Sequence, residues 1–227
     1  MTALQINRPI RSFVRREGRM TQAQARAIDT LWQQYGVDLI DTPLDLDALF
    51  GHRAPRILEI GFGNGESLAV LAQRNPDVDF LGIEVHRPGV GHLLMLAHER
   101  DIRNLRVICA DAVEVLSKQL PQNSLDTIQI FFPDPWPKKR HHKRRLIQAP
   151  LVKLLIPILK PGGRLHLATD WQNYAEHMLA VLEAESDLVN TQDDGFAPRP
   201  DERPVTKFER RGQKLGHWVW DLIFTRR

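Results

Sequence analysis

One segment near the middle of the chain joins a single acid to a dense run of basic residues. Residues 131–145 read FFPDPWPKKRHHKRR, and Asp134 lies there between Pro133 and Pro135. Proline fixes its own φ angle and biases the preceding residue toward extended geometry. We therefore expect a carboxylate held in one position, where it could stabilise positive charge that develops in a reaction. A stiff turn with no chemical role would use the same Pro-Asp-Pro sequence, so that alternative stays open.

The basic run that follows contains no acidic residue. Residues 138–145 read KKRHHKRR, whereas an exposed helix face usually mixes acids with bases. An unrelieved run of this kind predicts contacts with phosphate, and Trp136 beside it offers a stacking surface for a base. His141 and His142 are adjacent in sequence and have no Cys or carboxylate partner nearby, so we expect no metal site.

A glycine-rich loop lies earlier in the chain, in the sequence LEIGFGNGES. Gly61, Gly63 and Gly65 allow a tight turn and close approach of a ligand. A dinucleotide-binding loop reads G-x-G-x-x-G, but here the third glycine comes one position early. Glu66 also places negative charge where a phosphate would bind at a helix N-terminus. The loop therefore predicts a ligand other than a dinucleotide.

Three acids follow the ends of three successive predicted strands. Glu59 suits a cationic ligand, Glu84 could accept hydrogen bonds from two ribose hydroxyls, and Asp111 could accept one from an adenine amine. Together they describe a site for an adenosine that carries positive charge, such as S-adenosylmethionine. Each acid could instead cap a helix, which is an equally good explanation of Asp111 alone but a poor one of Glu84 and of the whole set.

Apolar β-rich runs alternate with helical segments from residue 54 onward, which predicts the scaffold that holds these residues. The predicted strands cover residues 56–60, 79–85, 106–110, 126–132, 164–170 and 217–225. The predicted helices cover residues 67–74, 90–100, 113–118, 146–159 and 172–185. Short, continuously apolar strands are typical of parallel sheets buried on both faces. The alternation indicates a doubly wound α/β fold with its ligand site at the carboxyl ends of the strands.

Residues 1–50 are expected to form a basic arm and short helices ahead of a main domain at residues 51–227. Thr21 and Gln24 form a capping box that predicts the start of a helix, and a second short helix is expected over residues 44–50. The arm carries Arg8, Arg11, Arg15, Arg16 and Arg19. It could be a solvated tail or an arm that binds an anionic partner.

Composition limits the classes of protein to which the chain can belong. Of its 227 residues, 42% are hydrophobic, which is enough for a folded core, and the net charge is only +3. A single cysteine, Cys109, excludes an internal disulfide framework and suits a reducing compartment. We see no signal peptide and no apolar run of the ~20 residues that a spanning helix needs, so we expect a cytoplasmic protein.

Five motifs together resemble the bacterial tRNA (guanine-N7-)-methyltransferase family. They read LEIGFGNGES, GIEVHRPGVG, FPDPWPKKRHHKRRL, ATDWQNYAEHML and RPVTKFERRG, and the resemblance extends over nearly the whole chain. It implies a Rossmann-like class I methyltransferase fold, with a seven-stranded, mostly parallel sheet and one antiparallel strand near the C-terminus. It also implies methyl transfer from S-adenosylmethionine to N7 of a guanine in the variable loop of tRNA, with S-adenosylhomocysteine as product.

The same resemblance implies roles for individual residues. The residues expected to bind the methyl donor are Glu59, Gly61, Gly63, Gly65, Glu84, Asp111 and Asp134, and Asp134 would also be the catalytic residue. Those expected to hold the guanine are Lys138, Asp170, Thr206, Lys207, Phe208 and Glu209. Those expected to contact RNA are Arg140, His141, His142, Lys143, Arg144 and Arg145. We expect no membrane contact and no obligatory second protein subunit, while the set of tRNAs and the choice between monomer and homodimer stay open.

Three other functions are alternatives to this one: a methyltransferase of another class that acts on an exocyclic amine in DNA or on protein, a nucleic-acid-binding protein without activity, and an NAD-linked oxidoreductase. A methyltransferase that acts on an exocyclic amine often carries Asp/Asn-Pro-Pro-aromatic after the fourth strand, whereas this chain has Asp-Pro-Trp-Pro at residues 134–137. A nucleic-acid-binding protein without activity would not need the acids Glu59, Glu84 and Asp111 together. An NAD-linked oxidoreductase is disfavoured by the spacing of the glycines.

Overall fold

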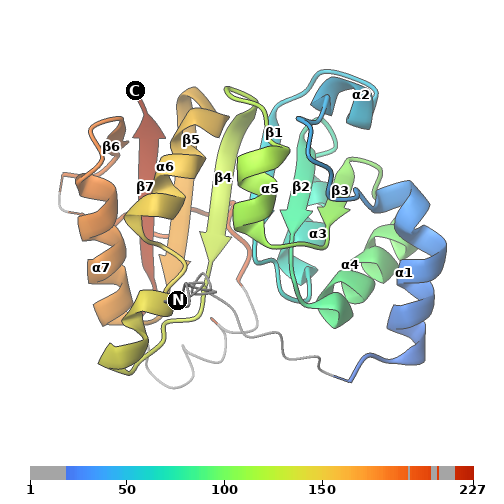
Figure 1. Ribbon diagram of the computed structural model, residues 1–227, viewed down its shortest axis with the longest axis horizontal. Helices are drawn as coiled ribbons and strands as arrows, with labels where there is room; N and C mark the ends of the chain where they lie inside the picture. The colour runs from blue at the N-terminus through green and yellow to red at the C-terminus, as the bar shows by residue number, and fades with distance from the viewer. Residues whose placement is uncertain (1–18, 194, 206–208, 210–217) are drawn as a thin grey trace, which may run out of the picture.

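The fold is known from a computed structural model that describes residues 19–193, 195–205, 209 and 218–227. Within them the chain forms one seven-stranded sheet, in the order β3-β2-β1-β4-β5-β7-β6 (Figure 1). The strands are β1 (Arg56–Ile60), β2 (Asp79–Ile83), β3 (Leu105–Ile108), β4 (Leu125–Phe131), β5 (Leu159–Thr169), β6 (Leu188–Asn190) and β7 (Trp220–Arg226). Neighbours among β1 to β5 pair in parallel, while β7 pairs antiparallel with both β5 and β6. The strand directions confirm the predicted class I methyltransferase topology.

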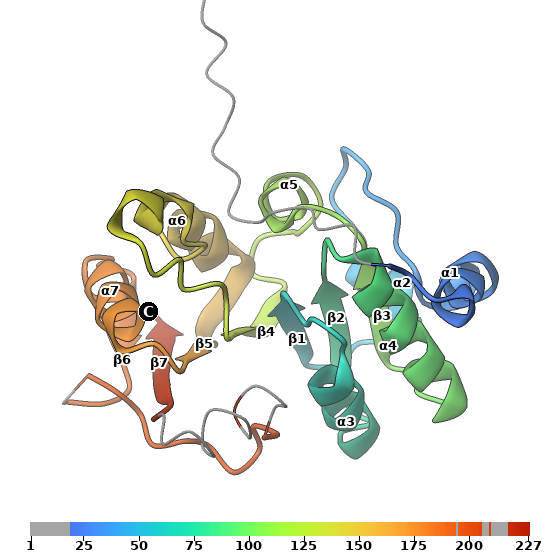
Figure 2. The ribbon, with the colours of Figure 1, turned by 90° about the horizontal axis from the view of Figure 1, so that it is seen from below.

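Helices cover both faces of this sheet (Figure 2). They are α1 (Gln22–Tyr35), α2 (Leu46–Phe50), α3 (Glu66–Arg74), α4 (Arg87–Glu99), α5 (Ala112–Lys118), α6 (Ala149–Ile158) and α7 (Gln172–Glu183), together with the 3₁₀ helix η1 (Lys139–Arg144). One apolar core lies between the sheet and α5, α6 and α7, and a second lies where α1, α3 and α4 pack. Because α1 contributes to the second core, the described part of residues 1–50 packs against the main domain.

The strand order reverses between β1 and β4, which places a crevice at the carboxyl ends of these strands. Strand β1 pairs with β2 on one side and with β4 on the other. Chain connections leave this point in opposite directions, so the loops after β1 and β4 separate there. This is the edge at which the sequence predicts the ligand site.

Most of the expected elements are found, with a few differences in their limits. The capping box of Thr21 and Gln24 is present at the start of α1. Helix α4 begins three residues earlier than predicted, because Pro88 is accommodated in its first turn. Strand β5 begins at Leu159 instead of residue 164, although the sequence Lys-Pro-Gly-Gly in between reads as a turn. The short strand β6 was not predicted from the residue pattern.

Three parts of the predicted site or arm lie outside the described residues. They are the N-terminal arm up to residue 18, the substrate-binding residues Thr206, Lys207 and Phe208, and residues 210–217 after them. In the part of the chain that the structure describes, no helix is long and apolar enough to cross a membrane. No group of three or more His, Cys, Asp or Glu side chains suited to a metal ion occurs there either.

Candidate active site

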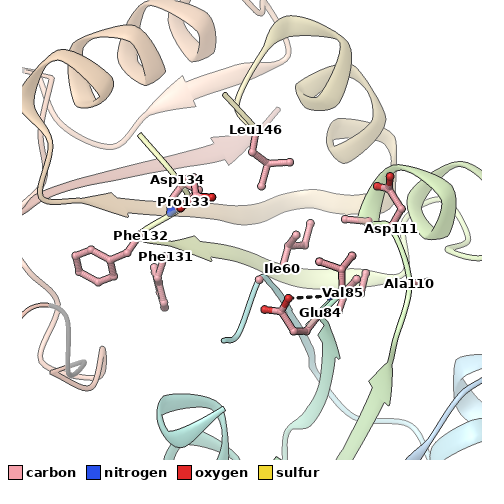
Figure 3. A pocket seen from close by; sticks show the side chains of 13 residues that line it. Ile60, Glu84, Val85, Ala110, Asp111, Phe131, Phe132, Pro133, Asp134 and Leu146 are labelled. Carbon is pink, nitrogen blue, oxygen red and sulfur yellow. Dashed lines mark hydrogen bonds between the residues drawn. The ribbon is translucent and has the colours of Figure 1, made fainter. Parts of the chain in front are cut away.

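A pocket of about 220 Å³ opens at the carboxyl ends of β1, β2, β3 and β4 (Figure 3). Its walls combine apolar side chains with three acids, Glu84, Asp111 and Asp134, which come from the ends of three different strands. The other lining residues are Ile60, Gly61, Ile83, Val85, Ala110, Ala112, Phe131, Phe132, Pro133 and Leu146. The structure thus brings together three of the four acids that the sequence predicts for the donor site.

The glycine loop between β1 and α3 has the backbone conformation that its glycines predict. Gly61, Gly63 and Gly65 all have positive φ angles, of 78°, 59° and 74°. The N–H group of Gly63 donates to the carboxylate of Glu84, at 2.9 Å. A Cβ atom added at Gly89 of α4 would lie 2.0 Å from the carbonyl oxygen of Gly63, so a glycine is needed there too. Gly89 was not predicted, although its sequence, Pro-Gly-Val-Gly, was a visible signal.

Glu84 is held by the backbone around it. Its carboxylate accepts hydrogen bonds from the N–H groups of Gly63, Val85 and His86, at 2.9, 2.7 and 2.9 Å. A carboxylate offers about four lone-pair directions, so these bonds leave capacity for a ligand hydroxyl. The side chain is therefore fixed at the pocket wall before any ligand binds.

Asp111 has both of the roles that the sequence left open. It caps helix α5, because its Oδ1 accepts a hydrogen bond from the N–H of Val113 at 3.0 Å. It also lines the pocket, at the end of β3. Helix capping and a position at the ligand site are therefore compatible for this residue.

Glu59 is placed differently from the other acids, because it is buried inside the sheet and is absent from the pocket wall. Its side chain is paired across β1 and β4 with Gln129, whose Nε2 donates to the Glu59 carboxylate at 2.9 Å. Burial raises the pKa of Glu59 to about 7, and the nearby charge of Glu84 acts in the same direction, while the bond from Gln129 acts against them. The partner Gln129 was not predicted, although a polar residue within an apolar strand was a possible signal.

Asp134 lies on a loop whose backbone is constrained at both ends. Phe132 and Trp136, two residues on either side, have positive φ angles of 51° and 44°, which are uncommon for bulky side chains. The N–H of Phe132 donates to the Ala168 carbonyl of β5 at 2.8 Å, and Arg145 donates to the Pro135 carbonyl at 3.0 Å. The exposed carboxylate of Asp134 is therefore held at the mouth of the pocket by structure around it.

The basic run after this loop divides into an exposed part and a buried residue. A cationic and aromatic surface combines the exposed Lys138, Lys139, Arg140 and Lys143 with the partly buried His141, His142, Arg144 and Trp136. In it, the Arg144 guanidinium lies 5.0 Å from the Trp136 ring. Arg145 is only 3% exposed. Its guanidinium donates to Pro135 and to Asn173 of α7 and lies over the Tyr174 ring. This burial argues against the predicted contact of Arg145 with RNA, because most of its donors are already used within the protein.

Three buried charged residues, Arg203, Glu209 and Asp221, form a network that lies against the start of the Asp134 loop. Arg203 is 2% exposed, and its guanidinium donates to both carboxylate oxygens of Glu209, at 2.7 and 3.0 Å, and to Asp221 of β7 at 3.1 Å. The same guanidinium lies 5.8 and 5.7 Å from the rings of Phe131 and Phe132. Arg203 thus joins three segments that are distant in sequence.

This network changes what is expected of Glu209. The sequence resemblance assigns Glu209 to the guanine, but here its side chain is fully buried and paired with Arg203. Of the other described residues assigned to the guanine, Lys138 is exposed and Asp170 is partly buried at the end of β5, and neither lines the pocket. Arg203 was missed entirely, because nothing in the local sequence around it indicates burial.

The fold and the acidic pocket define the chain as a class I methyltransferase. Its fold matches the crystal structure of the 16S rRNA methyltransferase KamB with a TM-score of 0.59 and 15% sequence identity, over 81% of this chain and 94% of that one. Residues 53–222 match the model of a family described as putative methyltransferases.

Sequence relatives make the assignment more specific. The chain is 62% identical to the tRNA (guanine-N(7)-)-methyltransferase of Alkalilimnicola ehrlichii, over 97% of this chain and 94% of that protein. It is 60% identical to the enzyme of the same name from Neisseria meningitidis serogroup C, over 96% of this chain and 92% of that protein. The chain therefore belongs to the tRNA (guanine-N(7)-)-methyltransferase family.

Proposed function

We propose that this chain transfers a methyl group from S-adenosylmethionine to N7 of a guanine in tRNA, forming 7-methylguanosine and S-adenosylhomocysteine. The observation that carries the proposal is the position of Asp134. Its carboxylate lies at the junction between the acidic pocket and the cationic surface of residues 138–144. A donor in the pocket and a nucleotide held by that surface would meet at this residue.

The pocket suits the nucleoside part of the donor. Glu84 is oriented by backbone N–H groups and can accept from a ribose hydroxyl, and Asp111 lies at the end of the next strand for the adenine amine. The walls between them are apolar, which suits a purine ring. Glu59 lies within β1 and does not line the pocket, so it would act on the donor from a distance. A cation bound in the pocket would favour the charged form of this acid.

This methyl transfer does not need a strong general base. Bound S-adenosylmethionine supplies an electrophilic methyl group on a positively charged sulfur, and guanine N7 carries an in-plane lone pair and no proton. As the N7–CH₃ bond forms, the S–CH₃ bond breaks and the positive charge moves to the purine. Asp134 would stabilise that charge and orient the ring through its N–H groups.

The RNA would be held by the exposed and partly exposed basic residues next to Asp134. We assign phosphate contacts to Arg140, His141, His142, Lys143 and Arg144, which lie in η1. The assignment of the guanine to Lys138, Asp170 and residues 206–208 remains part of the proposal, as does a target in the variable loop. A single cytoplasmic chain, with tRNA as its partner, fits this scheme.

Methyl transfer to unmodified tRNA tests the proposal directly. The protein would be incubated with methyl-labelled donor and, in parallel, with tRNA, duplex DNA and histone, and the labelled tRNA would be digested to nucleosides. We expect label in 7-methylguanosine from tRNA alone. Label in another nucleoside, in DNA or in protein would overturn the assignment, and so would tRNA binding without any transfer.

A further inference from the structure

Two exposed tryptophans, Trp171 and Trp218, lie just beyond the paired ends of β5 and β7, at the edge of the sheet that holds the active site. The ladder between β5 and β7 ends with Thr169 opposite Trp220. Trp171 follows Thr169 by two residues and Trp218 precedes Trp220 by two, so both tryptophans lie within two residues of this last pair. Trp171 still has extended backbone angles there, as the N-cap of α7. The two side chains are 39% and 79% exposed, and they are the aromatic ones among the large hydrophobic side chains exposed in the described part of the chain.

This pair lies close to the catalytic loop. Strand β5 is the neighbour of β4, which leads into Asp134, and β7 is the neighbour of β5. Adjacent strands are about 4.8 Å apart, so the pair is one to two strand spacings from the end of β4 along this edge. Asp170, which is proposed to contact the guanine, directly precedes Trp171.

Arg145 connects the pair to the cationic surface. Its guanidinium donates to the Asn173 side chain at 2.7 Å, in the first turn of α7, and to the carbonyl of Pro135 at 3.0 Å, in the catalytic loop. The loop, η1 and the start of α7 are therefore packed together by one buried side chain. RNA held by η1 would run beside Trp171.

The chemistry of the reaction supplies an occupant for this surface. Enzymes that act on a base generally take it out of its stack, and the neighbouring nucleotide then loses a stacking partner. Aromatic side chains replace such partners because every base has a π face, whatever its sequence. The cationic neighbours favour a polyanion here over a peptide with basic residues.

We propose that Trp171 and Trp218 stack on an unpaired nucleobase of the tRNA next to the guanine that is methylated. This inference rests on the proposed function, which it extends to a second nucleotide. The pair forms a sequence-tolerant platform that holds the strand on one side of the target, while η1 holds its phosphates.

Substitution of each tryptophan provides a test with little risk to folding, because both side chains are exposed. Trp218→Ala and Trp171→Ala should each weaken binding of unmodified tRNA by about 5- to 100-fold, the range for loss of one stacked base. Trp218→Phe should retain most of the affinity. The control Val189→Ala removes another exposed apolar side chain, on β6, and should bind as the parent does.

Salt dependence separates stacking from charge. Stacking releases no counterions, so the tryptophan variants should keep the parent's slope of log affinity against log salt. Affinity for S-adenosylhomocysteine should not change. A tRNA that lacks the base on one side of the mapped 7-methylguanosine should bind the parent more weakly by a similar factor, with no further loss in the double tryptophan variant.

The outcomes distinguish failure of this inference from failure of the proposed function. If the parent methylates tRNA and both alanine variants bind it as tightly as the parent does, the stacking proposal is overturned alone. The same holds if neither flanking abasic tRNA binds more weakly, or if the alanine variants flatten the salt slope. If the parent neither binds nor methylates tRNA, the proposed function fails first and this inference falls with it.

Discussion

The carboxyl edge of the sheet has two halves, which differ in the charge of their main side chains and in the groups that hold those side chains in place. On the side of β1 to β3, the acids that line the pocket are held by backbone N–H groups: Glu84 accepts from Gly63, Val85 and His86, and Asp111 caps the helix that follows it. On the side of β4 to β7, arginines are held largely by side chains of other elements. Arg145 binds Asn173 of α7, and Arg203 binds Asp221 of β7.

This difference indicates how the two binding functions are divided. The acids of the donor pocket are held by backbone N–H groups and not by the basic residues, so changes to these acids should affect donor binding without affecting RNA binding. The substrate half depends on buried ion pairs that position an exposed cationic surface. Changes there should affect stability when they remove a buried arginine and RNA binding when they remove an exposed one.

Substitution of Arg203 should have the largest effect, which is a loss of free energy of unfolding. Arg203→Met would remove the buried guanidinium that pairs with both Glu209 and Asp221, whose remaining partners include Arg199 and His166, and breaking a buried ion pair typically costs about 3–5 kcal/mol. The matched control is Arg199→Met, because Arg199 also reaches Glu209 but is 36% exposed, and it should cost below about 1 kcal/mol. Urea unfolding measures both free energies. Equal losses in the two variants would show that burial of Arg203 is not the source of its importance.

Asp134 lies where the two halves meet, and its charge should matter for turnover. Asp134→Asn keeps the shape of the side chain but removes the charge that would stabilise the methylated purine, so the rate should fall by about 10²–10³. Affinity for tRNA and for S-adenosylhomocysteine should change little. Single-turnover methylation at saturating donor measures this rate. A rate near that of the parent would leave Pro-Asp-Pro as a stiff turn.

Glu59 should make the donor half sensitive to pH. Its carboxyl has a pKa of about 7 in the folded state and an ordinary value of 4.5, so the folded protein retains a proton that the unfolded chain has already lost. Stability should therefore fall as pH rises from about 4.5 to about 7, by about 3 kcal/mol, since one pKa unit is worth about 1.4 kcal/mol. Unfolding of the parent and of Glu59→Gln across this range provides the comparison. Parallel profiles would mean that Glu59 titrates normally.

Substitution of Glu84 tests whether donor binding can be weakened without weakening tRNA binding. Glu84→Ala removes the acceptor of three backbone N–H groups and of the proposed ribose hydroxyl, so donor affinity should fall by about 2–3 kcal/mol. Calorimetry with S-adenosylhomocysteine measures the loss, and tRNA affinity in the absence of donor serves as the control. Comparable losses of both affinities would contradict the division into two halves.

The donor half was largely predictable from sequence, because its residues lie at fixed offsets from strands and turns. Glu84, Asp111 and the glycines could be placed once β1 to β3 were recognised. The substrate half was not, since burial there depends on partners such as Asn173 and Asp221 that only the tertiary fold brings near. Arg144 and Arg145 are adjacent and chemically identical, yet one lies against Trp136 at the surface and the other is buried under α7.

That adjacent pair provides the smallest and most specific test. Arg144→Gln removes one partly exposed charge from the cationic surface, so the slope of log tRNA affinity against log salt should flatten by about one unit. Between 50 and 200 mM salt, such a change alters affinity by only about fourfold.

Arg145→Gln removes the same charge from the chain but not from the surface, since Arg145 is 3% exposed and bound to Asn173 and Pro135. It should lower the free energy of unfolding by about 1–3 kcal/mol and leave the slope unchanged. Fluorescence anisotropy with unmodified tRNA over a series of salt concentrations measures the slopes of the folded variants. If Arg145→Gln flattens the slope as much as Arg144→Gln does, Arg145 leaves its buried position when RNA binds and contacts the RNA itself.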